Sequence, residues 1–533
     1  MNSLQPNSMF VRLVLVVVLL TVAGPLVGNA AEVAFQDRYH TDHRTTPKLV
    51  FFPEVEARGS GDAESVGRAY LETYGELYQL PSAPADIRLW RVRESLLGTH
   101  LRFQQDLHGF PVEGAEIIVS VGHDLRVSKV YNNTYPVIER PVMPEQIISG
   151  DIAVDIAWHH LKVHGEILDM TPTAELVWVP EGLGFRLIHL TQVNVTEPFG
   201  RWQHSIDAVT GEILSVRRTE ISKVPQEMPD FAGYDGPVHD RGQAVARFED
   251  LEQERLSAKA GKRATVDGSG LVFDPDPRTT LADDSLMDNS PAGNFDAAYL
   301  QRTLSDITEN AGTYSLVGPW VTIVNFESPN TQPSTTNDGI WTAVRGDNAF
   351  NDAVTYFHID QNQRYMQSLG FIGATGIQQG SISVDTDALN GADNSYYSPS
   401  LNRLAFGHGC VDDNEDADVI LHEYMHAITH DINPSWNGGH TGAIGEGLGD
   451  YWGGSYSYST PNGPTYHPAW AFTWDGQLAC WPGRDMDDHT QMYNPACTYS
   501  AHSSCGGRNA DQLWSTCMFS SLVDLVGQGR TRE

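Results

Sequence analysis

Three side chains of the kinds that bind zinc lie between residues 422 and 446, at spacings that could bring them to one metal ion. His422 and His426 lie four residues apart in the segment HEYMH, and Glu446 follows twenty residues after the second histidine in GEGLGD. On a helix, two histidines four apart share one face, so both imidazoles can reach one metal ion. Catalytic zinc takes three protein ligands and keeps a fourth position for water. The spacing therefore predicts one zinc ion held by His422, His426 and Glu446.

Two further carboxylates indicate which reaction a metal ion held by these residues could catalyse. Glu423 stands between the histidines and points to the open side of the metal, where zinc lowers the pKa of a bound water to near ~7, so we predict that it is the catalytic base. Asp450 follows Glu446 by four residues on the same helix face and is predicted to accept the spare ring N–H of His422. HEYMH alone would also fit two solvated helix histidines, but the added acids favour a metal site.

The region resembles the thermolysin-type metallopeptidases and their fungalysin-like relatives, in which two HExxH histidines and a glutamate about twenty residues on hold the zinc. The segment DNSYYSP, followed by LAFGHG, is similar to the edge strand with which that family binds a peptide by strand addition. The resemblance implies substrate-binding roles for Asn394 and for the backbone carbonyl of Ser395. A loop asparagine that caps its own backbone is the alternative for Asn394.

The chain departs from the family at the residues that stabilise the oxyanion. No tyrosine occurs from 427 to 445, and Asn437 occupies the aligned position, with Trp436 beside it as another substitute. The family also places a histidine downstream as a second donor, and His502 in YSAHSSCGG is our candidate. Losing one donor typically costs ~10²–10³ in turnover, so the departure bears on rate more than on reaction class. Two other downstream side chains remain alternatives to His502: His489 and Arg508.

The first thirty residues have the pattern of a secretion signal. Arg12 precedes an apolar run from Leu13 to Val22, and small residues lead to an expected cut after Ala30. This run is too short to span a bilayer, and no later stretch approaches eighteen apolar residues. We therefore expect a secreted, extracellular protein that has no membrane contact once the signal is removed.

The excess of acidic residues limits the kinds of molecule that the protein is expected to bind. A formal net charge of −34, from 34 basic and 68 acidic residues, argues against nucleic acid. Spaced carboxylates suit calcium, and Asp418, four residues before His422, matches a position that binds calcium in the resembled family. Its alternative is a negatively charged helix start, which stabilises a helix by itself. A weaker candidate for calcium is the acid group at 485, 487 and 488.

The five cysteines all lie in the last quarter of the chain, in a compartment where oxidation is allowed, and they predict one or two disulfides. None has a metal spacing, because there is no CxxC. With five cysteines, at least one must be free or pair outside the chain.

Upstream of the zinc motif the chain resembles a propeptide. Helical spacing from Glu64 to Tyr78 precedes strands that turn at 108–109 and 122–124, and the strand region is similar to the propeptide segment of fungalysin and thermolysin precursors. Residues 105, 109, 111, 112 and 114 carry that likeness. The segment IDAVTGEILSV resembles the end of a PepSY domain, and 234–265 has the composition of a linker, with candidate cleavage points at Lys262-Arg263 and at Arg255.

These patterns predict an α+β protein: a two-domain propeptide followed by a thermolysin-like catalytic domain, with a cleft between a β-rich and a helical lobe. The short stretch after His502 makes the helical lobe look truncated beside its relatives. The expected parts are a signal peptide (1–30), a propeptide motif (31–140), a PepSY-like domain (145–220), a linker with the maturation cut (221–265), a β-rich lobe (266–410) and a helical lobe (411–533).

The predicted function is a secreted zinc endopeptidase made as a zymogen, with proteins or peptides as substrates and its own propeptide as inhibitor. The alternative is a catalytically impaired relative that serves as a binding or inhibitory module. Glu423 separates the two, because a protein that has lost catalysis has little reason to keep a general base between two zinc ligands.

Overall fold

The computed structural model of the chain mixes helices and strands, as the sequence predicts. The structure describes these residues: 46–51, 61–80, 86–168, 170–219, 221–222, 234, 236–258, 264–434, 436, 439–476, 481–490, 492–494, 496–497, 499–504 and 509–529. They divide into two compact units, one of residues up to 143 with 178–186, the other of 144–177 with 187–533. The expected signal peptide at 1–30 lies outside the described residues.

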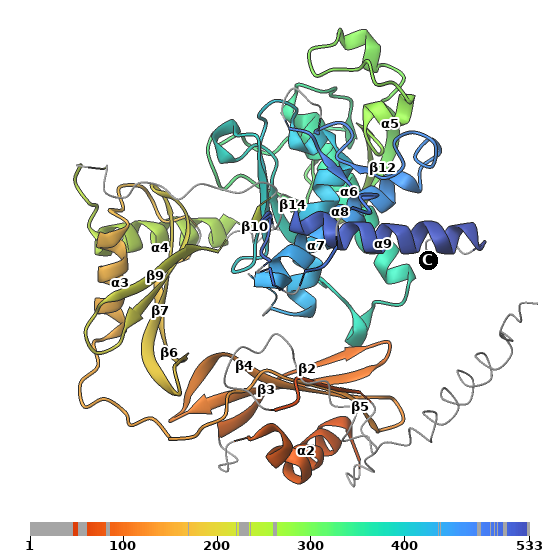
Figure 1. Cartoon of the computed structure of the whole chain (residues 1–533). Coiled ribbons are helices and arrows are strands. Elements are labelled where there is room, and N and C mark those ends of the chain that lie inside the picture. Colours follow the sequence, from red (N-terminus) through yellow and green to blue (C-terminus); the bar gives the residue numbers. More distant parts are fainter. Residues whose placement is uncertain are drawn as a thin grey trace, which may run out of the picture. The chain divides into compact units, whose positions relative to one another are not determined.

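The first unit packs a helix on an antiparallel sheet (Figure 1). Asp62 caps helix α2 (Ala63–Tyr74), whose buried Val66 and Tyr70 lie in one core with Leu101 and Val119 of the strands. A short 3-10 turn, η2 (Gly75–Tyr78), extends α2. The strands lie in the order β1-β5-β4-β3-β2, with bounds β1 (Leu49–Phe51), β2 (Ile87–Ser95), β3 (Gly98–Leu107), β4 (Phe110–Val121) and β5 (Val127–Asn132).

The turn between β3 and β4 falls at His108 and Gly109, as predicted, and both residues have positive φ, of 53° and 82°. Glycine adopts that conformation without strain. The pattern of alternating residues therefore located this hairpin correctly.

The second unit begins with a layer of antiparallel strands covered by two helices. Its bounds are α3 (Gly150–His160), β6 (Thr173–Glu181), β7 (Gly184–Thr196), β8 (Phe199–Asp207), β9 (Ile213–Arg218) and α4 (Arg241–Ala258); residues 178–186 of β6 and β7 belong to the first unit. We call α3, β7, β8, β9 and α4 the β7–β9 layer. Trp158 of α3 and Trp202 of β8 are fully buried in its core.

One segment differs from the sequence prediction. Residues 234–265 have the composition of a linker, yet most of that stretch is helix α4, and Ala244 and Phe248 on it pack into the core of the β7–β9 layer. On the part of the helix whose side chains the structure describes, these two apolar residues face the core while Arg247 and Glu249 are exposed. Arg255, one of the candidate cleavage points, lies within α4. Lys262 and Arg263, the candidate cleavage point, lie outside the described residues.

The β-rich part of the second unit contains two five-stranded sheets, ordered β15-β13-β12-β11-β16 and β10-β18-β19-β17-β14, around helix α6 (Asn348–Ser368). The strands are β10 (Ile221–Ser222), β11 (Ala264–Val272), β12 (Leu300–Asn310), β13 (Thr313–Ser315), β14 (Val321–Ile323), β15 (Thr335–Thr336), β16 (Ile340–Trp341), β17 (Ile382–Asp385), β18 (Ser395–Ser398) and β19 (Arg403–Phe406). The other helical segments are α5 (Pro277–Leu281), η5 (Ala292–Phe295), η6 (Gly373–Thr375), η7 (Leu389–Gly391) and η8 (Asp413–Glu415).

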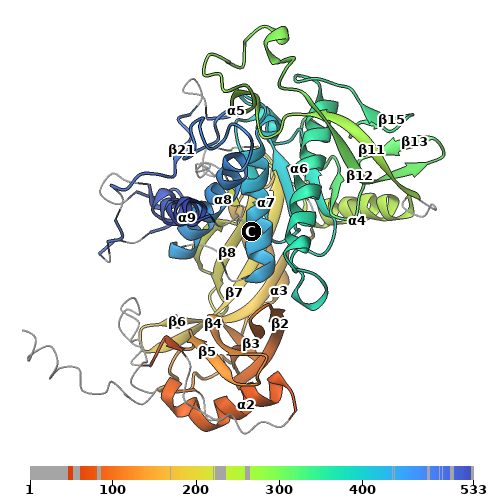
Figure 2. The same ribbon diagram turned by 90° about the vertical axis from the view of Figure 1, so that its right-hand side faces the viewer.

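Three helices make the following part: α7 (Ala417–Ile432), α8 (Gly439–Tyr458) and α9 (Ala510–Gly527), with a small sheet of β20 (Trp470–Ala471) and β21 (Arg484–Asp485). Figure 2 shows α7 between α6 and α8. One hydrophobic core runs through both parts, because Phe350 and Val354 of α6 share it with Val419 and Tyr424 of α7. None of the helices among the described residues has the length and apolar character to cross a membrane.

Candidate metal centre

Helix α7 presents both histidines of HEYMH on one side. Asp416 caps the helix by accepting a hydrogen bond from the backbone N–H of Asp418. The rings of His422 and His426, one turn apart, have centroids 4.8 Å from each other. Both histidines and Glu423 are at most 1 % exposed. The local sequence thus builds a buried helix face that carries two imidazoles and a carboxylate.

Glycines in α8 let that helix approach this face. A Cβ on Gly449 would lie 2.5 Å from the His422 ring, and one on Gly453 would lie 2.6 Å from the backbone carbonyl oxygen of Asp418. Any larger residue at either position would push the two helices apart. Gly449 and Gly453 therefore let α8 come close enough to bring Glu446 to the histidines of α7.

The three predicted zinc ligands meet at one point. His422 Nε2 lies 3.2 Å from His426 Nε2 and 3.3 Å from Glu446 Oε2, and His426 Nε2 lies 3.5 Å from Glu446 Oε1. Ligands placed tetrahedrally at about 2.0–2.2 Å from zinc stand roughly 3.3–3.6 Å from one another. Two imidazoles and a carboxylate at these separations fit a zinc ion.

Behind the ligands lies a buried carboxylate held by an arginine. Asp450 Oδ1 is 3.1 Å from His422 Nδ1, the contact that the sequence predicts, and 2.5 Å from Nη1 of Arg484. The guanidinium is 5 % exposed, and its Nη1 also lies 3.9 Å from Glu446 Oε2. An acceptor on Nδ1 leaves Nε2 of His422 free to face a metal.

His502 reaches the same cluster from the opposite side. Its Nε2 lies 3.4 Å from Glu446 Oε2, and its Nδ1 lies 3.0 Å from Asp511 Oδ2 at the start of α9. The backbone N–H of His502 also donates to Asp511 Oδ1, at 3.0 Å. Arg484 Nη2 is 3.2 Å from His502 Nδ1. Asp511 and Arg484 therefore fix the imidazole at the edge of the metal centre.

Burial and neighbouring charges set the protonation of the ligands. Burial opposes ionisation of Glu446, but the facing imidazoles of His502, His426 and His422 hold its pKa well below the ordinary range. Burial lowers the pKa of His426 to about 3. Burial also opposes the charge on His422, yet Asp450 and Glu446 raise its pKa to about 10. An ionised Glu446 and a neutral His426 are ready for a metal, while His422 must release a proton when it binds one.

The predicted substrate strand, β18, lies between β10 and β19 in its five-stranded sheet. Ser395 begins β18, which pairs on one edge with β19 and on the other with β10, where Ile221 lies opposite Tyr397 and Ser222 opposite Tyr396. The Asn394 side chain accepts a hydrogen bond from the backbone N–H of Ser395, at 3.0 Å, as in the backbone-capping alternative. Ser395 Oγ donates to the Asp413 carboxylate. A segment from the N-terminal half thus covers the edge predicted for a peptide.

The alternatives for the oxyanion donors are positioned differently. His489 is largely exposed and contacts Asp487, with 2.7 Å between Nε2 and Oδ1. The indole N–H of Trp436 donates to the carbonyl of Thr441, at 2.5 Å. Asn437 and Arg508 lie outside the described residues. Of the candidates that the structure describes, His502 is the one beside the zinc ligands.

The acids before α7 are held by protein groups. Asp418, the predicted calcium ligand, accepts from Ser457 Oγ at 2.5 Å and from the Phe472 backbone N–H at 2.9 Å. Burial raises the pKa of Asp418 to about 7 against these hydrogen bonds. The one cluster of three mutually close carboxylates within the described part of the chain is Asp393, Asp413 and Asp475, and it does not include Asp418. The capped, acidic helix start is the arrangement observed.

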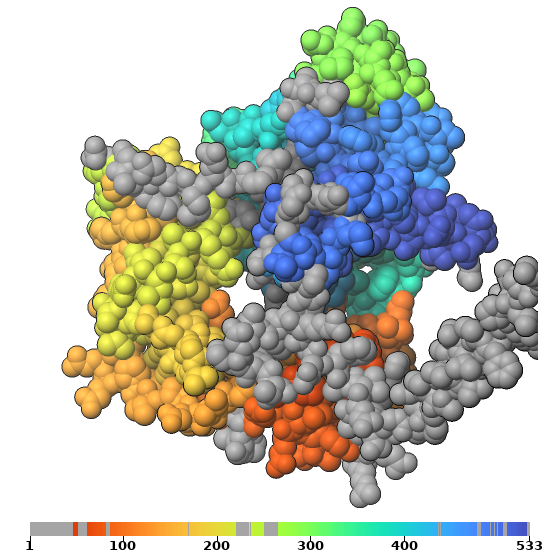
Figure 3. Space-filling model, in the orientation of Figure 1, coloured from red at the N-terminus to blue at the C-terminus, as the bar shows by residue number. Residues whose placement is uncertain are grey.

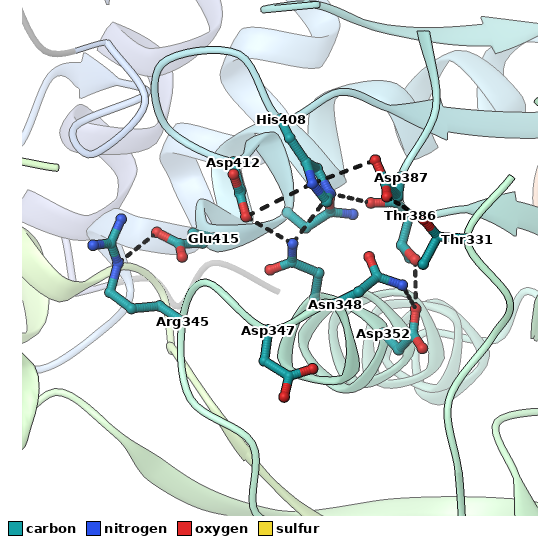
Figure 4. Close-up of polar contacts among 12 residues, drawn as sticks. Thr331, Arg345, Asp347, Asn348, Asp352, Thr386, Asp387, His408, Asp412 and Glu415 are labelled. Carbon is teal, nitrogen blue, oxygen red and sulfur yellow. Dashed lines mark hydrogen bonds and ion pairs between the residues drawn. The ribbon is translucent and has the colours of Figure 1, made fainter. Parts of the chain in front are cut away.

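Polar contacts also fix the segment that leads into α7 (Figure 4). His408 Nε2 lies 2.6 Å from the carbonyl oxygen of Thr386, and its Nδ1 lies 3.4 Å from Asp387 Oδ1. Arg345 Nε pairs with Glu415 Oε2 at 3.0 Å. These contacts join the segment before α7 to residues just before α6 and just after β17, so the β-rich part positions the helix that carries two of the predicted metal ligands.

Sequence reasoning missed Arg484 and the role of Asp511. Arg484 stands next to the acids at 485, 487 and 488, which drew attention as possible calcium ligands, and nothing in its own spacing points to Asp450. Asp511 was recognisable only as the start of a helix. Arg484 and Asp450 are 34 residues apart in the sequence, and only the fold brings them together. Asp511 follows His502 by nine residues, but nothing in that spacing predicts their contact.

The comparisons with known proteins agree with the motifs. Residues 86–134 match the family model described as the fungalysin/thermolysin propeptide motif. Bacillolysin from Bacillus cereus is 23% identical over 487 residues, covering 87% of this chain and 77% of the bacillolysin sequence. The solved C-terminal domain of YpeB from Bacillus megaterium is 12% identical with a TM-score of 0.20, covering 32% of this chain and 71% of that one.

The chain is thus thermolysin/fungalysin-like: it carries the propeptide motif of these metallopeptidases and aligns with bacillolysin over most of its length. The likeness of residues 145–220 to a PepSY domain stays a prediction, as do the expected domain limits.

Proposed function

We propose that the protein is a secreted zinc endopeptidase made as a zymogen. The observation that carries this proposal is the convergence of His422, His426 and Glu446 at separations of 3.2–3.5 Å, with Glu423 beside them on α7. A bound zinc ion would supply an activated water and polarise the peptide carbonyl. Measuring zinc content together with casein hydrolysis, with and without a chelator, tests it; stoichiometric zinc without any hydrolysis would favour the binding-module alternative.

The residues of the chain have separate roles in this proposal. Glu423 accepts the proton of the attacking water and delivers it to the leaving amine. His502, held by Asp511 and Arg484, donates a hydrogen bond to the developing oxyanion. Asp450 orients His422. Asn394 and Ser395 would hold the substrate along β18, by the strand addition that β10 already makes there.

Secretion, calcium binding and disulfide formation are also parts of the proposed function. Cys410 and Cys497 are disulfide-bonded, whereas Cys517 is a free, exposed thiol. Cys480 and Cys505 lie outside the described residues. For calcium, Asp418 stays the proposed ligand, and it would have to exchange its contact with Ser457 for the ion.

Changing His502 to alanine should lower kcat about 10²–10³-fold and leave KM within a few-fold, because an oxyanion donor acts mainly in the transition state. Steady-state hydrolysis of a fluorogenic peptide measures both constants. His489→Ala is the matched control, since His489 is an exposed histidine that contacts Asp487, and it should behave as the unmodified enzyme. An unchanged kcat in His502→Ala would remove the residue from the mechanism.

Activity should appear only as the precursor is cut between about 219 and 270. The pairing of Ile221 and Ser222 with β18 supports this, because a segment that covers the substrate edge blocks a peptide from adding there. N-terminal sequencing of the active species, compared with a time course of peptide hydrolysis, provides the measurement. Full activity of the intact precursor would contradict the zymogen proposal.

A further inference from the structure

A buried arginine of the β7–β9 layer faces the β-rich part of the same unit. Arg201, in β8, is fully buried, and its guanidinium carbon lies 4.9 Å from the centre of the Tyr396 ring in β18. Glu327, which is 4 % exposed, accepts a hydrogen bond from the Tyr396 hydroxyl. A cation, an aromatic ring and a carboxylate therefore lie together in one buried site. The segments that contribute them are nearly two hundred residues apart in the sequence.

The electrostatics tie these three groups together. Burial raises the pKa of Glu327 to about 7, and Arg201 is the strongest influence in the opposite direction. Arg201 likewise opposes the rise in the pKa of the buried Tyr396. The other charged group that acts on Glu327 is Asp385 of β17, which raises its pKa and accepts the backbone N–H of Glu327 at 2.9 Å. Removing Arg201 would leave a buried carboxylate without its cation, which is strongly unfavourable.

The contact surface around Arg201 is incompletely packed. A cavity of about 600 Å³ lies between the two parts, lined on one side by residues that include Phe199 and Arg218 and on the other by residues that include Leu389 and Asn394. Phe199 also lies 6.4 Å from Tyr396, ring centre to ring centre. Beyond these contacts, the strand pair of β10 and β18 spans two residues only. Part of the contact surface is therefore an open cavity, and Arg201 is a fully buried charged group beside it, the kind of residue that can dominate an interface.

We propose that Arg201, which packs on the ring of Tyr396 whose hydroxyl donates to Glu327, is the anchor that holds the β7–β9 layer on the catalytic part, and that this anchor keeps the layer bound after the chain is cut. The proposal rests on the zymogen function proposed above. Cutting the connection would then be insufficient for release, because the anchor lies within the folded layer and not in the segment that is cut. The mature enzyme would expose an acidic, aromatic pocket whose fitting partner is the arginine of the cleaved propeptide.

The test uses the full chain carrying Glu423→Gln, so that it does not digest itself, with a site for a sequence-specific protease inserted between Lys262 and Arg263. After the cut, size-exclusion chromatography measures how fast the two fragments separate. Arg201→Met should speed separation roughly 10²–10³-fold, since it leaves Glu327 buried without its partner. Arg217→Met is the matched control, because Arg217 is an exposed arginine of β9, and it should leave the rate unchanged.

Glu327→Gln alters the same contact on the side of the catalytic part, and it should also speed separation of the two fragments. If Arg201 and Glu327 interact, the double variant should separate more slowly than the product of the two single effects predicts. Separation of the Arg201→Met fragments at the unmodified rate would refute the anchor. Effects of Arg201→Met and Glu327→Gln that simply multiply in the double variant would also refute it, because Arg201 would then act only inside its own layer. If Arg201→Met does not fold, an unchanged rate in Glu327→Gln refutes it. Because fragment separation is measured and peptide hydrolysis is not, a chain without peptidase activity tests the anchor equally well.

Discussion

Replacing Glu423 by glutamine should lower peptide hydrolysis roughly 10²–10⁴-fold or more while the zinc content stays at one ion per chain. Glu423 is fully buried on α7, next to His422 and three residues before His426. Glutamine has the same shape, so the helix and the ligand positions should persist, but an amide cannot accept the proton of the attacking water. The measurement pairs metal analysis with hydrolysis of a fluorogenic peptide by the processed enzyme.

The matched control is Asp524→Asn, an equally small change of a carboxylate to an amide. Asp524 is exposed on α9, and the dark blue end of that helix reaches the surface in Figure 3. It should leave both zinc content and hydrolysis unchanged. Activity of Glu423→Gln within tenfold of the unmodified enzyme would remove Glu423 from the role of base.

The sequence was informative where the chemistry depends on local spacing. His422 and His426 are neighbours because a helix repeats every 3.6 residues, and Glu446 and Asp450 share a face for the same reason. The hairpin at His108 and Gly109 was predictable too, because alternating residues and a glycine define it within a few positions. Contacts of this kind need no knowledge of the tertiary fold.

Contacts between distant segments were beyond such reasoning. Arg484 reaches Asp450, 34 residues before it, only because the fold brings the two together, and no periodicity encodes that contact. Asp511 comes within 3.9 Å of the same arginine because α9 packs against α8. Helix α4 was missed because a charged stretch poor in aromatics has the composition of a linker, although its Ala, Arg, Glu, Gln and Leu residues also favour a helix, which Phe248 fastens to the core of the β7–β9 layer. Tertiary packing outweighed local preference there.

Replacing Glu446 by alanine should abolish both zinc binding and hydrolysis. Two imidazoles alone cannot complete a site that takes three protein ligands, and the substitution also removes the one carboxylate that faces His422, His426 and His502 together. Asp450 and Asp511 contact the Nδ1 atoms of His422 and His502, so the loss of Glu446 removes the carboxylate that lies where the three Nε2 atoms converge, which disfavours bringing a cation there.

Metal analysis of the purified chain after dialysis gives the result directly. His426→Ala should share the loss, because it removes another of the three ligands. His430→Ala is the control on the same helix: His430 lies one turn beyond His426, where its Nδ1 is 3.2 Å from the Tyr397 hydroxyl, and the variant should retain its zinc. Since α7 and α8 pack closely at their glycine contacts whether or not a metal is bound, the Glu446→Ala chain should stay folded, and its circular dichroism should match the unmodified protein. Full zinc occupancy in folded Glu446→Ala would overturn the ligand assignment and leave His502 or Asp450 as the third ligand.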